Sequence, residues 1–121
     1  MPLVRIDITG AKPETYKRAL LSGARLAVTS ALGVPDSRVT VRLFEATPEC
    51  VDMPACRTDR FTTVEVLLYE GRTPELKAAL ISTLRTVYAG NPGIEPSEVA
   101  IFIHDASPQD LDVLPGEAEA H

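Results

Sequence analysis

The second residue of the chain, Pro2, carries a group that could do acid–base chemistry. It follows Met1, and a methionine before a small residue is readily removed, which would leave Pro2 with a free secondary amine. An unperturbed α-amino group has a pKa of roughly 7.7–8.0, and apolar burial or a nearby cation lowers it. A neutral amine at pH 7 can remove a proton next to a carbonyl and return it elsewhere. By position alone, Pro2 is more simply the start of an edge strand, where proline is tolerated.

Arg72 is the second candidate for chemistry. It stands beside Gly71 and just before a predicted helix, where a strand gives way to a loop at the rim of a sheet. An arginine there can bind a carboxylate through two parallel hydrogen bonds and stabilise an enolate as charge develops. The simpler interpretation is a solvated arginine near a helix start, although a cation gains nothing from the helix dipole at that end.

Alternating and helical patterns predict the elements that position these residues. Residues 3–9 alternate apolar and polar side chains, as a half-buried strand does. Pro13 suits the first turn of a helix, apolar residues then recur at three- and four-residue spacing, and Gly33 ends the helix. A strand follows at 39–43. The second half predicts the same order: a strand at 63–69, a helix from Pro74 to the Gly90–Gly93 stop, and a strand at 99–104.

The two halves of the chain repeat one another. Residues 33–43 align with residues 93–103 at an offset of 60. Near the start of each half the offset is one residue larger: Gly10 aligns with Gly71 and Pro13 with Pro74. This difference indicates a one-residue slip in a loop. The slipped alignment gives the first half Ala11 at the place of Arg72. No proline begins the second half near Thr62 or Thr63, so we expect one active site per chain.

The pattern predicts an α/β fold of the α+β sandwich type, made of two tandem βαβ units. They would form one four-stranded sheet with both helices on one face. We expect unit one at 2–48, a linker at 49–60, unit two at 61–106 and a tail at 107–121. The other face of the sheet would stay bare although its strands carry Val, Leu and Phe, so we expect an oligomer.

Composition narrows the class of protein. The chain has 121 residues, 45% of them hydrophobic and 24% charged, with a net charge of −5, which fits one globular domain. There is no apolar run long enough to span a bilayer and no basic footprint for nucleic acid, so neither is expected as a partner. The start of the chain does not resemble a signal peptide, so we expect a cytoplasmic location.

Two cysteines, Cys50 and Cys56, lie close together in the expected linker. A zinc site would need closer spacing and more ligands, and the only histidines are His104 and His121. Two reduced thiols in a loop are the preferred interpretation, with a redox pair as the alternative. We expect no metal and no organic cofactor.

Two motifs carry a resemblance to a known family. The start Met1-Pro2-Leu3-Val4-Arg5-Ile6-Asp7-Ile8, the tandem units, and the run Tyr69-Glu70-Gly71-Arg72-Thr73-Pro74-Glu75-Leu76-Lys77 resemble the tautomerase superfamily, which has the 4-oxalocrotonate tautomerase-like (MIF-like) fold. The resemblance covers nearly all of residues 2–105. It is closest to the fused-unit branch, which contains malonate semialdehyde decarboxylase and cis-3-chloroacrylic acid dehalogenase. Members of that branch are typically homotrimers, which would cover the bare sheet face.

The resemblance implies a site built on Pro2 and Arg72 as catalytic residues. In the decarboxylase a second arginine stands where this chain has Glu70, and in the dehalogenase an arginine stands where it has Tyr69. The decarboxylase also uses an aspartate just after a Gly-Val-Pro turn, and that role would fall here to Ser37 or Arg38. Arg42 could supply a second substrate-binding cation, although an exposed arginine is the simpler interpretation.

The function implied is cofactor-independent keto–enol isomerisation of a small carboxylate. The substrate would be a 2-oxo acid such as phenylpyruvate or 2-hydroxymuconate, with the N-terminal proline as general base and acid. One alternative is a malonate semialdehyde decarboxylase-like, dehalogenase-like or hydratase-like enzyme acting on a three-carbon acid. Another is a trimeric binding module with a decayed site.

Overall fold

Four strands and two long helices make up residues 1–110, the part of the chain that the computed structural model describes. In chain order they are β1 (Leu3–Thr9), α1 (Glu14–Leu32), β2 (Thr40–Ala46), β3 (Thr62–Tyr69), α2 (Pro74–Gly90) and β4 (Val99–Ala106). Short 3-10 turns precede β2 and β4 (Asp36–Arg38, Pro96–Glu98) and follow them (Pro48–Cys50, Pro108–Asp110). All six predicted elements are present, and β2 and β4 run further than predicted. Of the predicted tail, residues 111–121 lie outside the described residues.

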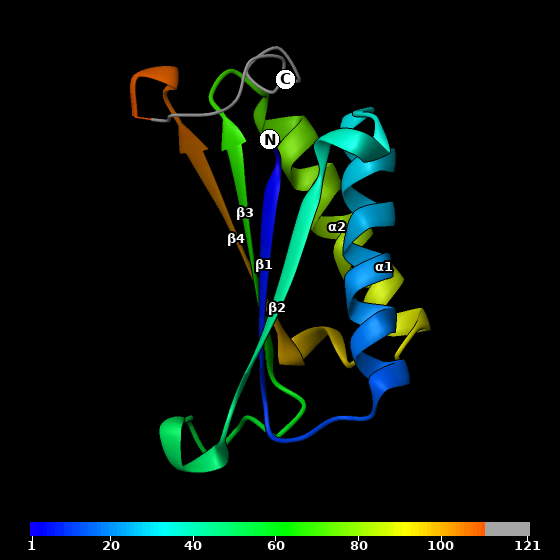
Figure 1. Ribbon diagram of the computed structural model, residues 1–121, viewed down its shortest axis with the longest axis vertical. Coiled ribbons are helices and arrows are strands. Elements are labelled where there is room, and N and C mark those ends of the chain that lie inside the picture. Colours follow the sequence, from blue (N-terminus) through cyan, green and yellow to red (C-terminus); the bar gives the residue numbers. More distant parts are fainter. Residues whose placement is uncertain (111–121) are drawn as a thin grey trace.

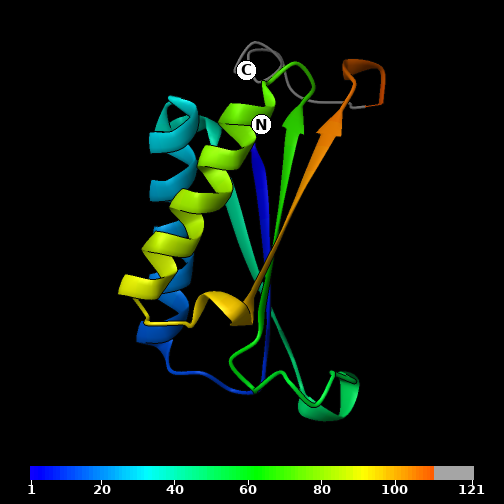
Figure 2. The same cartoon turned by 180° about the vertical axis from the view of Figure 1, so that it is seen from behind.

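The strands form one sheet in the order β2-β1-β3-β4 (Figure 1). Within each unit the strands are parallel, β1 with β2 and β3 with β4, while the central pair β1 and β3 is antiparallel. Both helices lie on the same face of the sheet (Figure 2). The predicted fold class is therefore confirmed. Because β1 is a central strand, the interpretation of Pro2 as the start of an edge strand is wrong.

The helix boundaries follow from local chemistry. Gly33 ends α1 in the left-handed conformation, with φ of 67°, and its N–H donates to the carbonyl of Thr29. Thr73 caps α2, its hydroxyl oxygen accepting from the N–H of Leu76 at 3.2 Å, and Pro74 follows as the first helical residue. Pro13 precedes α1 as the cap residue and is not in its first turn as predicted.

The core lies between the helices and the sheet. Alternate strand residues point to the helices and are buried, among them Val4, Ile6, Ile8, Val64, Val66 and Leu68. The two helices approach closely at Gly23, where an added Cβ would lie 2.9 Å from Cγ1 of Val87. Beside this contact the hydroxyl of Tyr88 donates to the carbonyl of Leu20 at 2.7 Å. The helices therefore pack directly on each other as well as on the sheet.

The face of the sheet without helices, here called the open face, is more polar than predicted. The valines of β1 and β3 face the helices, and the residues on the open face include Leu3, Arg5, Asp7, Arg42, Phe44, Glu65, Phe102 and His104. The guanidinium of Arg5 lies 4.2 Å from the ring centroid of Phe44. Nε2 of His104 lies 3.1 Å from Oε1 of Glu65. The bare face was predicted correctly, and it carries charged residues beside Leu3, Phe44 and Phe102.

The two units match at a constant offset of 60 residues. The same contacts recur at this offset: Gly10 N–H to Ala46 O and Glu70 N–H to Ala106 O; Lys17 with Glu45 and Lys77 with Asp105; Arg25 with the Asp36 carbonyl and Arg85 with the Pro96 carbonyl. The predicted slip, which aligned Gly10 with Gly71 and Pro13 with Pro74, is therefore wrong. Pro13 matches Thr73, because each carbonyl accepts from the N–H four residues on.

The segment between β2 and β3 carries both cysteines. Cys50 and Cys56 are exposed and free, not joined to each other. Among the described residues no helix combines the length and apolar character needed to cross a membrane.

Candidate active site

Pro2 lies at the end of the sheet where β1 begins. Its side chain is buried, and its carbonyl accepts a hydrogen bond from the N–H of Thr40 at 3.2 Å. On its other side β1 runs antiparallel to β3, with Leu3 opposite Leu67. Continuing this register by one residue sets Pro2 opposite Leu68. Pro2 thus lies at the start of β1, between the neighbouring strands β2 and β3.

Arg72 follows β3 at this same end of the sheet. β3 ends at Tyr69, which is 2% exposed, and Gly71 then turns the chain with φ of 111°, a conformation that favours glycine. Because β1 and β3 are antiparallel, the start of one lies at the end of the other. The fold therefore brings Pro2 and Arg72 to the same end of the sheet, although 69 residues separate them in the sequence.

The guanidinium of Arg72 has an unsatisfied donor. Its Nε is buried and has no hydrogen-bond partner among residues 1–110. A buried donor without a partner is uncommon, since most are paired with protein or solvent. Such a donor at a helix start, where the backbone N–H groups also point outward, suits an anionic ligand.

The matching position in unit one is Lys12, not Ala11 as predicted. Lys12 Nζ donates to the carbonyl of Thr9 at 2.8 Å and to that of Asp59 at 2.9 Å. The place of Pro2 is taken there by Thr62, which lies inside the chain and has no free amine. At this far end of the sheet the cation therefore donates to backbone carbonyls.

The two other predicted site residues lie in different places. Ser37 is exposed in the turn Asp36–Arg38, which leads directly into β2 beside Pro2. Arg42 is exposed on the open face, opposite Arg5 in the register, and stacks 5.1 Å from the ring centroid of Phe44. The structure thus brings Ser37 to the same end as Pro2 and Arg72, and it sets Arg42 on the far side of the sheet from the helices.

Two tethers fix the surroundings of this end. Nη1 of Arg25, on α1, donates to the carbonyl of Asp36 at 2.7 Å. Lys77, in the first turn of α2, pairs with Asp105 of β4. Sequence reasoning missed both, although the repeat offset of 60 signals them, because each has a counterpart in the other unit.

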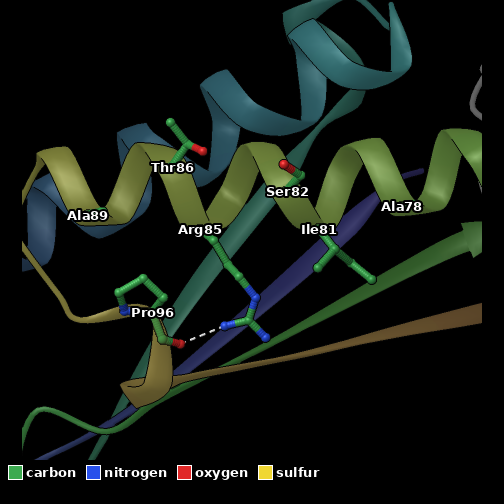
Figure 3. A pocket seen from close by; sticks show the side chains of 7 residues that line it. All are labelled: Ala78, Ile81, Ser82, Arg85, Thr86, Ala89 and Pro96. Atoms are coloured by element: carbon green, nitrogen blue, oxygen red, sulfur yellow. Dashed lines mark hydrogen bonds between the residues drawn. The ribbon is translucent and has the colours of Figure 1, made fainter.

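A groove elsewhere on the surface runs along the outer side of α2 (Figure 3). It is lined by Ala78, Ile81, Ser82, Arg85, Thr86, Ala89 and Pro96. None of the four predicted site residues lines this shallow groove. We therefore place the candidate chemistry at the end of the sheet and not in the groove.

The arrangement suits proton transfer on an anionic substrate. With Met1 removed, the nitrogen of Pro2 would be a free amine able to act as a base, and Arg72 has a guanidinium of the kind that binds carboxylates. Among residues 1–110 there is no group of three or more His, Cys, Asp or Glu residues placed to hold a metal ion.

Comparisons with known proteins agree with the fold. A family model described as a tautomerase enzyme matches residues 52–111. The wild-type fused 4-OT named Q0, solved as a symmetric trimer, is 30% identical, with 95% of this chain and 94% of that chain covered and a TM-score of 0.81. No curated protein sequence matches the chain.

Two further solved structures share the fold. Pt0534, inactivated by 2-oxo-3-pentynoate, is 27% identical, with 95% of this chain and 94% of that chain covered and a TM-score of 0.82. A malonate semialdehyde decarboxylase, described with decarboxylase and hydratase activities, is 22% identical, with 98% and 95% covered and a TM-score of 0.83.

Proposed function

The chain belongs to the tautomerase superfamily, and from this membership we propose that it is a tautomerase acting on a 2-oxo acid. Phenylpyruvate and 2-hydroxymuconate represent the substrate class. The observation that carries the proposal is the buried, unpartnered Nε of Arg72 at the end of the sheet where Pro2 begins β1. An amine and an unpaired cation at one site are the two groups that isomerisation of an enol acid requires.

The amine of Pro2 transfers the proton. After removal of Met1, its nitrogen takes the proton from the enol hydroxyl, the C–O bond becomes a carbonyl, and the same proton is returned to the adjacent carbon. The reaction is an isomerisation, so no co-reactant is consumed. The side chain of Pro2 is buried, and its nitrogen must be in the neutral form to act as the base.

Arg72 binds the substrate and stabilises the developing charge. Its guanidinium contacts the carboxylate and polarises the neighbouring carbonyl oxygen through N–H donors. Ser37, in the turn beside Pro2, adds a hydroxyl donor to the substrate. Arg42 lies on the open face, so in an assembled protein it would serve the site of a neighbouring copy.

We propose a homotrimer as the working assembly. The fused 4-OT that is 30% identical is a symmetric trimer, and the open face here carries charges of both signs beside Phe44 and Phe102. Cations from β1 and β2 and the carboxylate of Glu65 on β3 would complement each other between copies. Sedimentation equilibrium should give about three times the chain mass, and a monomer at micromolar concentration would contradict the proposal.

The direct test is an assay of purified protein with enol phenylpyruvate and with 2-hydroxymuconate. Mass spectrometry first establishes that Met1 has been removed. Ketonisation above the buffer rate supports the proposal, and its absence in protein with a free Pro2 amine contradicts it. The pH–rate profile identifies the role of the amine. If the amine acts as a base, the enzyme loses activity as pH falls through the pKa of the amine.

A second candidate is a decarboxylase-like, dehalogenase-like or hydratase-like enzyme acting on a three-carbon acid. The similarity in fold to the malonate semialdehyde decarboxylase favours it. Such an enzyme would use Pro2 in its protonated form, so its activity would fall as pH rises. A trimeric binding module with a decayed site is distinguished by labelling: an inert proline should react with a 3-halopropiolate no faster than a free peptide does.

A further inference from the structure

A single side chain on α1, Arg25, connects that helix to the backbone beside Pro2. Its Nη1 donates to the carbonyl of Asp36 at 2.7 Å. The same carbonyl accepts from the N–H of Val39 at 3.2 Å, which closes the turn before β2. The next residue, Thr40, donates its N–H to the carbonyl of Pro2 at 3.2 Å. The N–H groups of the neighbouring residues Val39 and Thr40 thus connect the carbonyl that Arg25 contacts with the carbonyl of Pro2.

The contact depends on the backbone carbonyl more than on the Asp36 side chain. Oδ1 of Asp36 lies 3.7 Å from Nη1 of Arg25, beyond hydrogen-bond distance, and 76% of that side chain is exposed. An exposed ion pair of this kind contributes little because solvent screens it. The directed hydrogen bond to the carbonyl therefore fixes the turn.

Unit two contains an equivalent contact between a helix arginine and a turn carbonyl at the opposite end of the sheet. Nη1 of Arg85 donates to the carbonyl of Pro96 at 2.6 Å, as Figure 3 shows, and to that of Val99 at 2.7 Å. The carbonyl of Pro96 also accepts the N–H of Val99. These contacts of Arg85 lie beside Thr62, which has no free amine. Arg85 therefore holds its turn in the same way, at an end of the sheet where no chemistry is proposed.

We infer that Arg25 is a positioning residue for the proposed site: it holds the turn Asp36–Arg38 and the start of β2 against Pro2. The inference rests on the proposed function for its catalytic consequence. The turn also carries Ser37. Loosening the turn would therefore displace Thr40, whose N–H donates to the Pro2 carbonyl, and the Ser37 hydroxyl that is proposed to contact the substrate. Small displacements of reacting groups are costly to catalysis.

Arg25→Met tests the inference, because it keeps much of the alkyl stem and removes the donors. Its matched control is Arg85→Met. We expect Arg25→Met to lower kcat/KM for enol phenylpyruvate by about 10- to 100-fold. Arg85→Met should stay within about twofold, because its contacts lie at the opposite end of the sheet from Pro2. Arg25→Lys, which restores one donor, should recover part of the loss, and Asp36→Asn, which keeps the carbonyl, should change little.

Amide hydrogen exchange gives a readout that is independent of activity. In Arg25→Met the amide of Thr40 should exchange about tenfold faster, whereas in Arg85→Met the acceleration should fall on Ala100, the matching residue of β4. Circular dichroism and thermal unfolding establish that each variant is folded. If Arg25→Met does not fold, Arg25→Lys compared with Arg85→Lys provides the same contrast.

The outcomes separate this inference from the proposed function. If the wild-type protein lacks ketonisation activity, the proposed function fails, and exchange at Thr40 still decides whether Arg25 holds the turn. If the wild type is active and Arg25→Met matches Arg85→Met in kcat/KM, the positioning role is overturned while the function stands. Unchanged exchange at Thr40 overturns the inference in either case.

Discussion

Lys12 and Arg72 occupy the same position in the two units but differ in what their nitrogen atoms contact. Lys12 Nζ donates to the carbonyls of Thr9 and Asp59, whereas Arg72 Nε is buried without a partner among residues 1–110. One cation therefore contacts the backbone of the fold, whereas the other has a donor left without a partner in this part of the chain. This contrast supplies an internal control for the first prediction.

Replacing Arg72 should affect activity and not stability. We expect Arg72→Ala to lower kcat/KM for ketonisation by about 10²- to 10³-fold, the usual cost of losing a donor to a developing oxyanion. Lys12→Met should instead lower the free energy of unfolding by about 1–3 kcal/mol, because it leaves two carbonyls without their donor. Steady-state kinetics and urea unfolding measure the two effects. The reverse pattern would place the substrate at the far end of the sheet.

The proposed catalysis also requires a free amine at Pro2. Pro2→Ala keeps a free amine after removal of Met1 but replaces the ring-held secondary amine by a mobile primary amine, so kcat should fall by up to about 10²-fold, less than for complete loss of a general base. Pro2→Leu, whose larger side chain hinders removal of Met1, should be inactive in protein whose mass shows that Met1 is retained. Activity in that Met1-retaining protein would show that the amine of residue 2 is not the base.

The close approach of the helices at Gly23 makes a stability prediction. In Gly23→Ala the new Cβ would lie 2.9 Å from Cγ1 of Val87 and 3.1 Å from Cε1 of Tyr88, so side chains must shift. We expect a loss of about 1–3 kcal/mol in the free energy of unfolding, typical of overpacking. Gly90→Ala is the control, because nothing lies within 4 Å of its added Cβ. Equal effects of both substitutions on the urea midpoint would contradict a steric origin.

Tyr88 predicts a loss of stability in alkali. Burial, with a smaller contribution from Tyr16, raises the pKa of the Tyr88 hydroxyl above its usual value near 10. Above pH 10 the unfolded chain therefore releases this proton while the folded chain keeps it, so stability present below pH 10 falls as pH rises. Tyr88→Phe should flatten this fall between about pH 10 and 11 in urea unfolding. Identical slopes in the two proteins would assign the alkaline loss to other groups.

Local sequence patterns predicted the helices and strands because the apolar residues of each recur with a clear period. The alternation in residues 3–9 and the apolar stripe ended by Gly33 depend on neighbours in the sequence, and both elements are present. The order of strands depends on pairing between distant segments. Local pattern therefore did not reveal that β1 is central, which changes the environment expected for Pro2.

The alignment of the loops failed for a physical reason. Gly10 and Gly71 both have positive φ, 79° and 111°, and their shared type suggested that they match. A turn needs a residue that tolerates such a conformation, but that residue can shift by one place while the strand and helix keep their register. The backbone hydrogen bonds on either side of the turn define how the two units align. They identify Lys12 as the counterpart of Arg72.

The open face carries residues that the expectation of Val, Leu and Phe did not include. The valines of β1 and β3 all point to the helices. What remains on the other side includes Arg5 and Glu65, which face each other across β1 and β3. An assembly through this face should therefore weaken in high salt more than an apolar contact would.

The joining of two units into one chain has an evolutionary consequence. A peptide bond precedes Thr62, so this position cannot present a free backbone amine. Duplication thus allows the two ends of a single small domain to differ: Lys12 supports the fold at one end, while both units contribute to the end where chemistry is proposed.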